Sequence, residues 1–311
     1  NLDRFGVSGA YLEGLKWIEM LEANHSLSQK EEWQVNEMKA LLLNERGNQD
    51  EFLPIWYKLL KQYREADRPE DVGKCLLTIA NHFIMLEDYE NALPLYKEAY
   101  QLALEHKSIE LQQVSGIMLI KYLCGAGYYS ESLEYYNKIK PEIAFNPSMQ
   151  NEVVKSYMEL NKPDSARIYL AARLLSERGD KIVLNCMMAE TYIPEGQEDS
   201  AFVFLDRAMK SYKEKAKNYQ KQGREAILPN CFLSPCYLFA DLLWKKGKIQ
   251  QASQYYMIVE PLMKERVKTP VRMELQIKAL TNFSSFCRET KQYEKALDLL
   301  ARRDSVLQTY L

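Results

Sequence analysis

A recurring pair of small residues, twelve positions apart, constrains the fold of this chain more than any other feature of its sequence. The clearest copy is Ala80 with Ala92, and the bulky residues Phe83 and Tyr96 follow them by three and four positions. One helical run of apolar residues ends near Leu86, and a second begins after a short polar turn. Small residues let two antiparallel helices approach closely, while bulky ones fill the grooves between them. The pattern therefore predicts a helix hairpin.

The same frame occurs six times along the chain. The small position of the second helix is held by Ala92, Ser132, Ala166, Ala201, Ala252 and Ala296. Twelve residues earlier stand Ala80, Ile120, Val154, Ala189, Ala240 and Ser284, and the bulky residues four positions later are Tyr96, Tyr136, Leu170, Leu205, Tyr256 and Leu300. This series resembles the tetratricopeptide repeat (TPR) family, whose period is 34 residues. The resemblance implies an all-α fold, a right-handed α-α superhelix in which antiparallel helix hairpins form a TPR-like solenoid.

The repeats are not evenly spaced, and this predicts how the chain is organised. The second-helix positions lie 40, 34, 35, 51 and 44 residues apart, so an extended helix or insertion is expected around residues 207–232. Six repeats are expected within residues 73–311, most regularly across 73–208. Residues 1–72 are expected to form N-terminal capping helices and a degenerate repeat, because terminal repeats are usually atypical. Apolar spacing predicts their helices over residues 10–23, 31–45 and 51–66.

Composition excludes several kinds of partner. Lys and Arg number 41 against 43 Asp and Glu, so no net positive field favours binding to nucleic acid. No apolar stretch approaches the roughly 20 residues of a membrane span. A basic run at 207–224 allows two interpretations, the solvated face of an overlong helix or a contact with an acidic partner or a phospholipid surface.

The residues that catalysis, a cofactor or a metal would need are sparse. The three histidines lie far apart, and the six cysteines contain no CxxC pair, so we expect the cysteines to be small core residues. Neither a GxSxG elbow nor a phosphate loop is present. We therefore expect no catalytic, cofactor-binding or metal-binding residues. A buried acid or histidine with a strongly displaced pKa in the groove would favour an enzyme.

The resemblance implies an inner groove lined by the first helix of each repeat. In that frame the candidate site residues are Asn81, Lys121, Asn151, Lys155, Glu190, Tyr237, Asp241, Trp244 and Arg288, accompanied by Leu77, Ile84, Thr281 and Ser285. Basic side chains lie toward one end and acidic ones toward the other, so an extended ligand would bind with a defined polarity. Leu77 stands where the carboxylate clamp of this family carries a lysine, which argues against a chaperone C-terminal tail as the ligand.

Two hypotheses for function remain open. In the first, the chain is a non-catalytic scaffold that binds a peptide or partner helix in the concave groove. In the second, it is the sensory or regulatory repeat domain of a longer bacterial membrane-linked signalling protein or transcriptional regulator, since it begins with Asn1 and its last helical pattern has no stop signal. The protein is expected in the periplasm if a leader has been removed or if the chain is a fragment of a sensor, and otherwise in the cytoplasm. The oligomeric state is left open.

Overall fold

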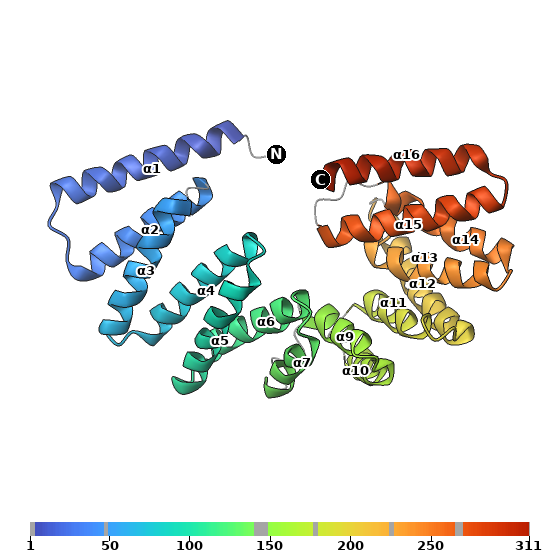
Figure 1. Ribbon diagram of the computed structural model, residues 1–311, viewed down its shortest axis with the longest axis horizontal. Helices are drawn as coiled ribbons and strands as arrows, with labels where there is room; N and C mark the ends of the chain where they lie inside the picture. The colour runs from blue at the N-terminus through green and yellow to red at the C-terminus, as the bar shows by residue number, and fades with distance from the viewer. Residues whose placement is uncertain are drawn as a thin grey trace. The chain divides into compact units, whose positions relative to one another are not determined.

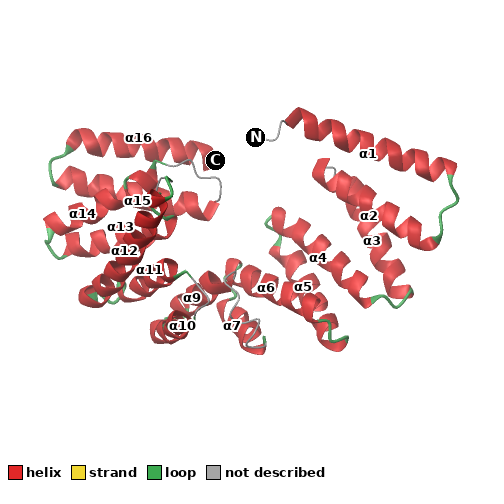
Figure 2. Cartoon of the chain, turned by 180° about the vertical axis from the view of Figure 1, so that it is seen from behind, coloured by secondary structure: helices red, strands yellow, loops and turns green. Residues whose placement is uncertain are grey.

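The chain is helical throughout the part that the computed structural model describes, residues 4–46, 49–139, 149–176, 180–223, 227–264 and 270–310. Within these ranges there is no strand, and short loops join the helices (Figure 2). The chain divides into two compact units, residues 1–153 and 154–311. The predicted division after residue 72 concerns the type of repeat, and it stays a prediction.

The first unit is a succession of helices in which each one contacts the next (Figure 1). The first helix of one repeat also contacts the first helix of the following repeat, α4 against α6. The helices are α1 (Arg4–Asn24), α2 (Gln29–Arg46), α3 (Gln49–Glu65), α4 (Pro69–Met85), α5 (Tyr89–Glu105), α6 (Ile109–Gly125) and α7 (Tyr129–Lys138).

In the second unit each helix from α10 to α14 contacts the next, and α16 packs on α15. Helix α9 begins just before the boundary between the units. Its first helices form a row, because α11 contacts α13 and α13 contacts α15. The helices are α9 (Gln150–Glu159), α10 (Pro163–Leu175), α11 (Lys181–Tyr192), α12 (Glu198–Lys221), α13 (Leu233–Lys245), α14 (Ile249–Val259), α15 (Pro270–Glu289) and α16 (Tyr293–Tyr310), with 3₁₀ turns η2 (Asn230–Phe232) and η3 (Pro261–Met263).

The small-residue frame read from the sequence is the contact surface of each hairpin. Every residue predicted at the two small positions is buried in all six repeats. Where a serine replaces alanine, its hydroxyl is satisfied across the hairpin, since Ser132 Oγ donates to the carbonyl oxygen of Ile120 at 2.9 Å. The all-α class and the antiparallel hairpins are thereby confirmed, and the chain has a TPR-like repeat fold. The hand of the superhelix stays a prediction.

The turns of the hairpins share one backbone motif. A residue that follows the capping residue of each first helix adopts a positive φ, as Glu87 does at 59° and Gly127 at 84°. In the α4–α5 turn the N–H of Asp88 donates to the carbonyl of Phe83 at 2.9 Å, and that of Glu87 donates to the carbonyl of Ile84 at 3.0 Å. This pair of bonds is the Schellman motif, which satisfies the last carbonyls of a helix and reverses the chain.

The N-terminal segment forms the three helices that the apolar spacing predicts. Trp33, Trp56 and Tyr63 are buried in one core between α2 and α4. Helix α1 packs on α2 and buries Ile18, yet the neighbouring Trp17 has 63% of its surface exposed. The segment thus packs as an extra layer of the solenoid, and its outer face remains partly apolar.

Helix α12 accounts for the widest gap between repeats. It has 24 residues, whereas its hairpin partner α11 has 12, so its C-terminal half extends beyond that partner. Lys213, Lys217 and Lys221 are exposed along this half. Other basic side chains of the helix are paired, Lys210 with Asp206 at 2.7 Å and Lys215 with Asp180 at 3.5 Å. Arg224 and Glu225, which the predicted basic run includes, lie outside the described residues.

Candidate functional site

The predicted site residues all lie on first helices, but the two units divide them. Asn81 on α4, Lys121 on α6 and Asn151 on α9 belong to the first unit, and all three are exposed. Lys155, Glu190, Tyr237, Asp241, Trp244 and Arg288 belong to the second unit. Asn151 and Lys155 lie four positions apart on α9, because the boundary between the units crosses this helix.

In the first unit the polar side chains are partly held by their own repeats. Asn81 accepts a hydrogen bond from the hydroxyl of Tyr96 on the partner helix α5. The ammonium group of Lys121 lies 5.2 Å from the centre of the Tyr122 ring, within the range of a cation–π contact. Tyr122 in turn stacks on Tyr96 with ring centres 5.3 Å apart. Aromatic rings of α5 and α6 therefore support the polar positions of this face.

In the second unit Asp241 on α13 is held by two neighbours. Its carboxylate accepts hydrogen bonds from the hydroxyl of Tyr256 on α14 and from the amide of Asn282 on α15. Burial raises the pKa of Asp241, while these two hydrogen bonds and Lys245 oppose the shift. Asp241 thus links α13 to α14 and α15, so this residue of the predicted groove has a structural role.

Tyr237 lies within electrostatic reach of both Asp241 and Glu190. Burial raises the pKa of the Glu190 carboxyl to about 7, against the effect of its hydrogen bond with Ser234. Tyr237 is only 5% exposed and joins the core. Burial, followed by the carboxylates of Asp241, Glu190 and Glu274, raises its pKa to about 12. The structure therefore brings together Glu190, Tyr237 and Asp241, although the Tyr237 ring offers little surface to a ligand.

Glu190 has the displaced pKa that would favour catalysis at such a position. It hydrogen-bonds the Ser234 hydroxyl, and the pKa of Tyr237 beside it is raised further above the ordinary value of 10, so this hydroxyl stays protonated. Among the described residues no group of three histidine, cysteine or acidic side chains is arranged to hold a metal ion. A half-buried carboxyl that is hydrogen-bonded to a serine beside a buried tyrosine is typical of a polar contact at the edge of a core.

The other predicted site residues of the second unit lie apart from Glu190, Tyr237 and Asp241. Lys155 on α9 lies near Glu274 on α15, whose pKa is lowered first by Lys278 and to a smaller extent by Lys155. Trp244 is half-buried, and its ring meets the edge of Phe286 with centres 5.7 Å apart. Arg288 is exposed and borders a pocket on the last hairpin.

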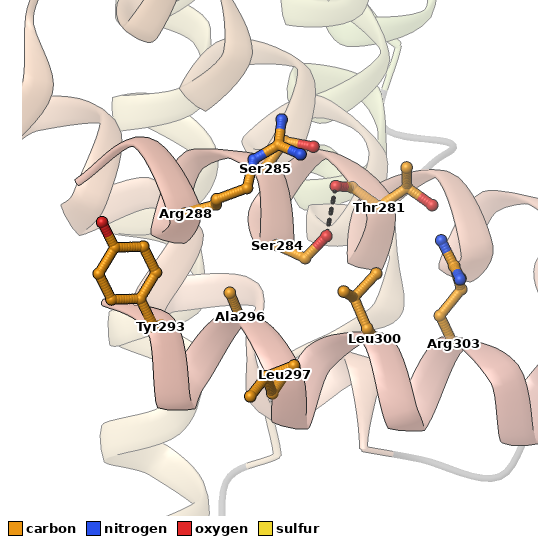
Figure 3. A pocket seen from close by; sticks show the side chains of 9 residues that line it. All are labelled: Thr281, Ser284, Ser285, Arg288, Tyr293, Ala296, Leu297, Leu300 and Arg303. Atoms are coloured by element: carbon orange, nitrogen blue, oxygen red, sulfur yellow. Dashed lines mark hydrogen bonds between the residues drawn. The ribbon is translucent and has the colours of Figure 1, made fainter. Parts of the chain in front are cut away.

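This pocket, between α15 and α16, has a volume of about 410 Å³. Figure 3 shows side chains from the two helices directed toward each other across it. Two arginines and four hydroxyl groups lie among apolar side chains in its lining, which consists of Thr281, Ser284, Ser285, Arg288, Tyr293, Ala296, Leu297, Leu300 and Arg303. Tyr293 and Leu297 are 59% and 67% exposed, although both are large apolar residues. We call this feature the α15–α16 groove.

The sequence reasoning identified one wall of the α15–α16 groove and missed the other. Thr281, Ser285 and Arg288 were placed at the site because they occupy the first-helix frame. Tyr293, Leu297 and Arg303 lie on the second helix, which the resemblance assigns to the outer surface. Their spacing along α16 was visible in the sequence, but an apolar residue on a helix face usually signals burial. Only the structure shows that this face has no neighbour within the described residues.

Comparisons with known proteins identify no family for this chain. No family model matches the chain, and no curated protein matches it. Among the solved structures that match is the "Crystal structure of APC/C hetero-tetramer Cut9-Hcn1", at 14% identity and a TM-score of 0.33. The match covers 95% of this chain and 57% of that chain, so this chain spans little more than half the length of its neighbour. The assignment of the fold therefore rests on the helices of this chain itself.

Proposed function

We propose that this chain is a non-catalytic protein-interaction scaffold that binds a peptide or a partner helix, and that the α15–α16 groove is a binding site of its second unit. The observation that carries the proposal is the exposure of Leu297 and Tyr293 above a hollow of about 410 Å³. Exposed apolar residues gathered around a depression mark interaction sites on soluble proteins. In a solenoid this face of a hairpin is the one on which another helix packs.

The lining of the groove indicates which partner would fit. An amphipathic helix would place apolar residues at successive turns over Leu297 and Leu300, as helices do in hydrophobic grooves. Arg288 and Arg303 border the groove at different ends, and Arg303 already donates to Asp304 at 2.7 Å. Arg288 is the exposed charge, so an acidic residue near one end of the bound helix would be favoured.

The test measures binding of an array of helical peptides that vary in apolar spacing and in terminal charge. We expect the intact chain to retain amphipathic peptides with an acidic end, and Leu297→Asp to weaken them at least about tenfold, because a charge would be buried under the ligand. Arg288→Glu should reverse the preference for acidic peptides. Ile168→Asp, at an exposed apolar residue of α10 in the same unit, is the matched control and should bind like the unaltered chain.

Two outcomes contradict the proposal. One is an array from which no peptide binds above background. The other is binding that Leu297→Asp leaves unchanged while circular dichroism shows both variants folded. The hypothesis of a regulatory domain within a longer protein stays a prediction, and the sequence of the gene downstream of Leu311 tests it.

Within the described residues no helix combines the length and the apolar character needed to cross a membrane.

A further inference from the structure

Three thiols from three separate elements meet in the core of the second unit. Cys186 on α11, Cys231 in the η2 turn and Cys236 on α13 belong to one apolar cluster. Helix α11 packs directly against η2, which places the first two thiols next to each other. All three cysteines are free. They are 45 and 5 positions apart in the chain, so the tertiary fold and not the sequence gathers them.

The three thiols differ in their surroundings. Cys186 and Cys236 are buried, whereas Cys231 is half-buried. A hydrogen bond joins the thiols of Cys186 and Cys231, and it lowers the pKa of Cys231 although burial opposes this. The same hydrogen bond, followed by burial, raises the pKa of Cys186. The charged groups that act on the pair are Asp180, which caps α11, and Glu190, and both disfavour a thiolate.

We infer that Cys186 and Cys231 form an oxidisable dithiol pair that closes to a disulfide in the presence of hydrogen peroxide. The inference rests on three features of the structure: the packing of α11 on η2, the contact between the two thiols, and the partial exposure of only Cys231. It does not depend on the proposed binding function. An accessible cysteine with thiolate character beside a second thiol is the arrangement found in proteins that oxidise reversibly.

The chemistry proceeds in two balanced steps. The Cys231 thiolate attacks one oxygen of hydrogen peroxide, the S–O bond forms, the O–O bond breaks, and the departing hydroxide takes up the thiol proton as water. The Cys186 sulfur then attacks the sulfenic acid on Cys231, the S–S bond forms, and the S–O bond breaks. The second hydroxide leaves with the Cys186 proton as water. Overall, two thiols lose two electrons and two protons, and one peroxide is reduced to two waters.

The bond would join α11 to the turn that precedes α13 and close a loop that contains all of α12. Because α12 extends beyond its partner α11, the chain rejoins the core of the second unit only at η2. Reduction by a dithiol reagent should reopen the loop.

The experiment treats the full chain with a small molar excess of hydrogen peroxide, alkylates the remaining thiols under denaturing conditions, and maps tryptic peptides by mass spectrometry. We expect four of the six cysteines to remain alkylated and a linked peptide pair from residues 182–207 and 225–245 to appear. Because the second peptide also contains Cys236, variants identify the partner. Cys231→Ser should abolish the linked pair, and Cys236→Ser should retain it.

Two variants at Cys186 distinguish loss of the thiol from impaired folding. Cys186→Ser places a hydroxyl in an apolar core, so Cys186→Ala is measured beside it, and both should stop oxidation at the sulfenic acid on Cys231. Cys75→Ser, at a buried cysteine of the first unit, is the matched control and should leave the link unchanged. The inference is overturned if all six cysteines remain alkylated, if the link survives in Cys231→Ser, or if the native chain stops at a Cys231 oxyacid without a link.

Discussion

At the scale of single residues, two repeats contain the same hydrogen bond between their two helices. Asn81 and Asp241 both follow the first-helix small residue by one position, and each accepts a hydrogen bond from a tyrosine 15 residues later. These tyrosines, Tyr96 and Tyr256, are fully buried at the bulky position of the second helix. The buried hydroxyl needs a partner, and the neighbouring polar position supplies it. Residues that seemed free to bind a ligand are therefore partly committed to their own hairpin.

Glu190 provides a prediction at this scale. Its carboxyl has a pKa of about 7 in the folded chain against an ordinary value of 4.5. The folded state therefore holds this proton more tightly than the unfolded state does, and the stability contributed by the group falls as pH rises from about 4.5 to about 7. Glu190→Gln removes the penalty, so it should raise the free energy of unfolding by roughly 2 kcal/mol more at pH 8 than at pH 5.

Urea unfolding at both pH values measures this difference. Glu289→Gln, at an exposed carboxylate of α15, is the matched control and should show the same small effect at each pH. An equal gain for Glu190→Gln at pH 5 and pH 8 would show that the carboxyl is not desolvated in the folded chain.

At the scale of elements, the hairpin turns determine how the helices follow one another. The Schellman turns place a residue in the left-handed region, and Asp67, Glu87, Lys107, Asn161 and Lys291 occupy it at φ between 53° and 62°. Glycine takes the same place at Gly127, Gly196 and Gly247. An L-residue in this region is strained, so these turns are stabilised by their hydrogen bonds and by helix packing rather than by local preference.

Lys291→Gly in the α15–α16 turn is the corresponding prediction. Relief of backbone strain should exceed the entropy that glycine adds to the unfolded chain, so the free energy of unfolding should rise by about 0.5–1 kcal/mol. Gly247→Ala, at φ 74° in the α13–α14 turn, should lower the free energy of unfolding, because it introduces backbone strain even though its methyl group would contact no other atom. Thermal melts of both variants decide the matter, and a fall in stability for Lys291→Gly contradicts the argument.

At the scale of the whole molecule, each unit has a core of its own. The cluster around Phe232, Tyr256 and Phe283 lies entirely within the second unit, and those around Trp56 and Tyr96 lie within the first. Repeats contact mainly their neighbours in sequence, so stability is close to a sum over adjacent hairpins. A fragment that retains one complete cluster should therefore fold without the rest of the chain.

Residues 149–311, which start just before α9, should form such a fragment. We expect a helical circular dichroism spectrum and a cooperative thermal transition, because the core cluster of the second unit is intact. Residues 270–311 alone retain only the last hairpin and should show no cooperative transition, since an isolated hairpin buries too little apolar surface. A non-helical 149–311 fragment would mean that the two units fold only together.

The sequence by itself determined the helices, the hairpins and the twelve-residue frame of small residues. This is because close helix packing restricts side-chain size at fixed intervals, and Ala92, Ser132 and Ala252 all display that restriction in the printed sequence. It also singled out Arg288 and Ser285, which line the α15–α16 groove. These are local properties, so they can be read within a window of two helices.

Only the tertiary structure decided which of these residues are buried and which are exposed. Tyr237 and Leu297 are both large and apolar at helical spacing, yet Tyr237 is buried and Leu297 is exposed. The difference depends on which helix packs on which face, and Cys186 beside Cys231 depends on it equally. Periodicity identifies an apolar face of a helix, whereas burial also requires a neighbour, and that neighbour is supplied by elements distant in the chain.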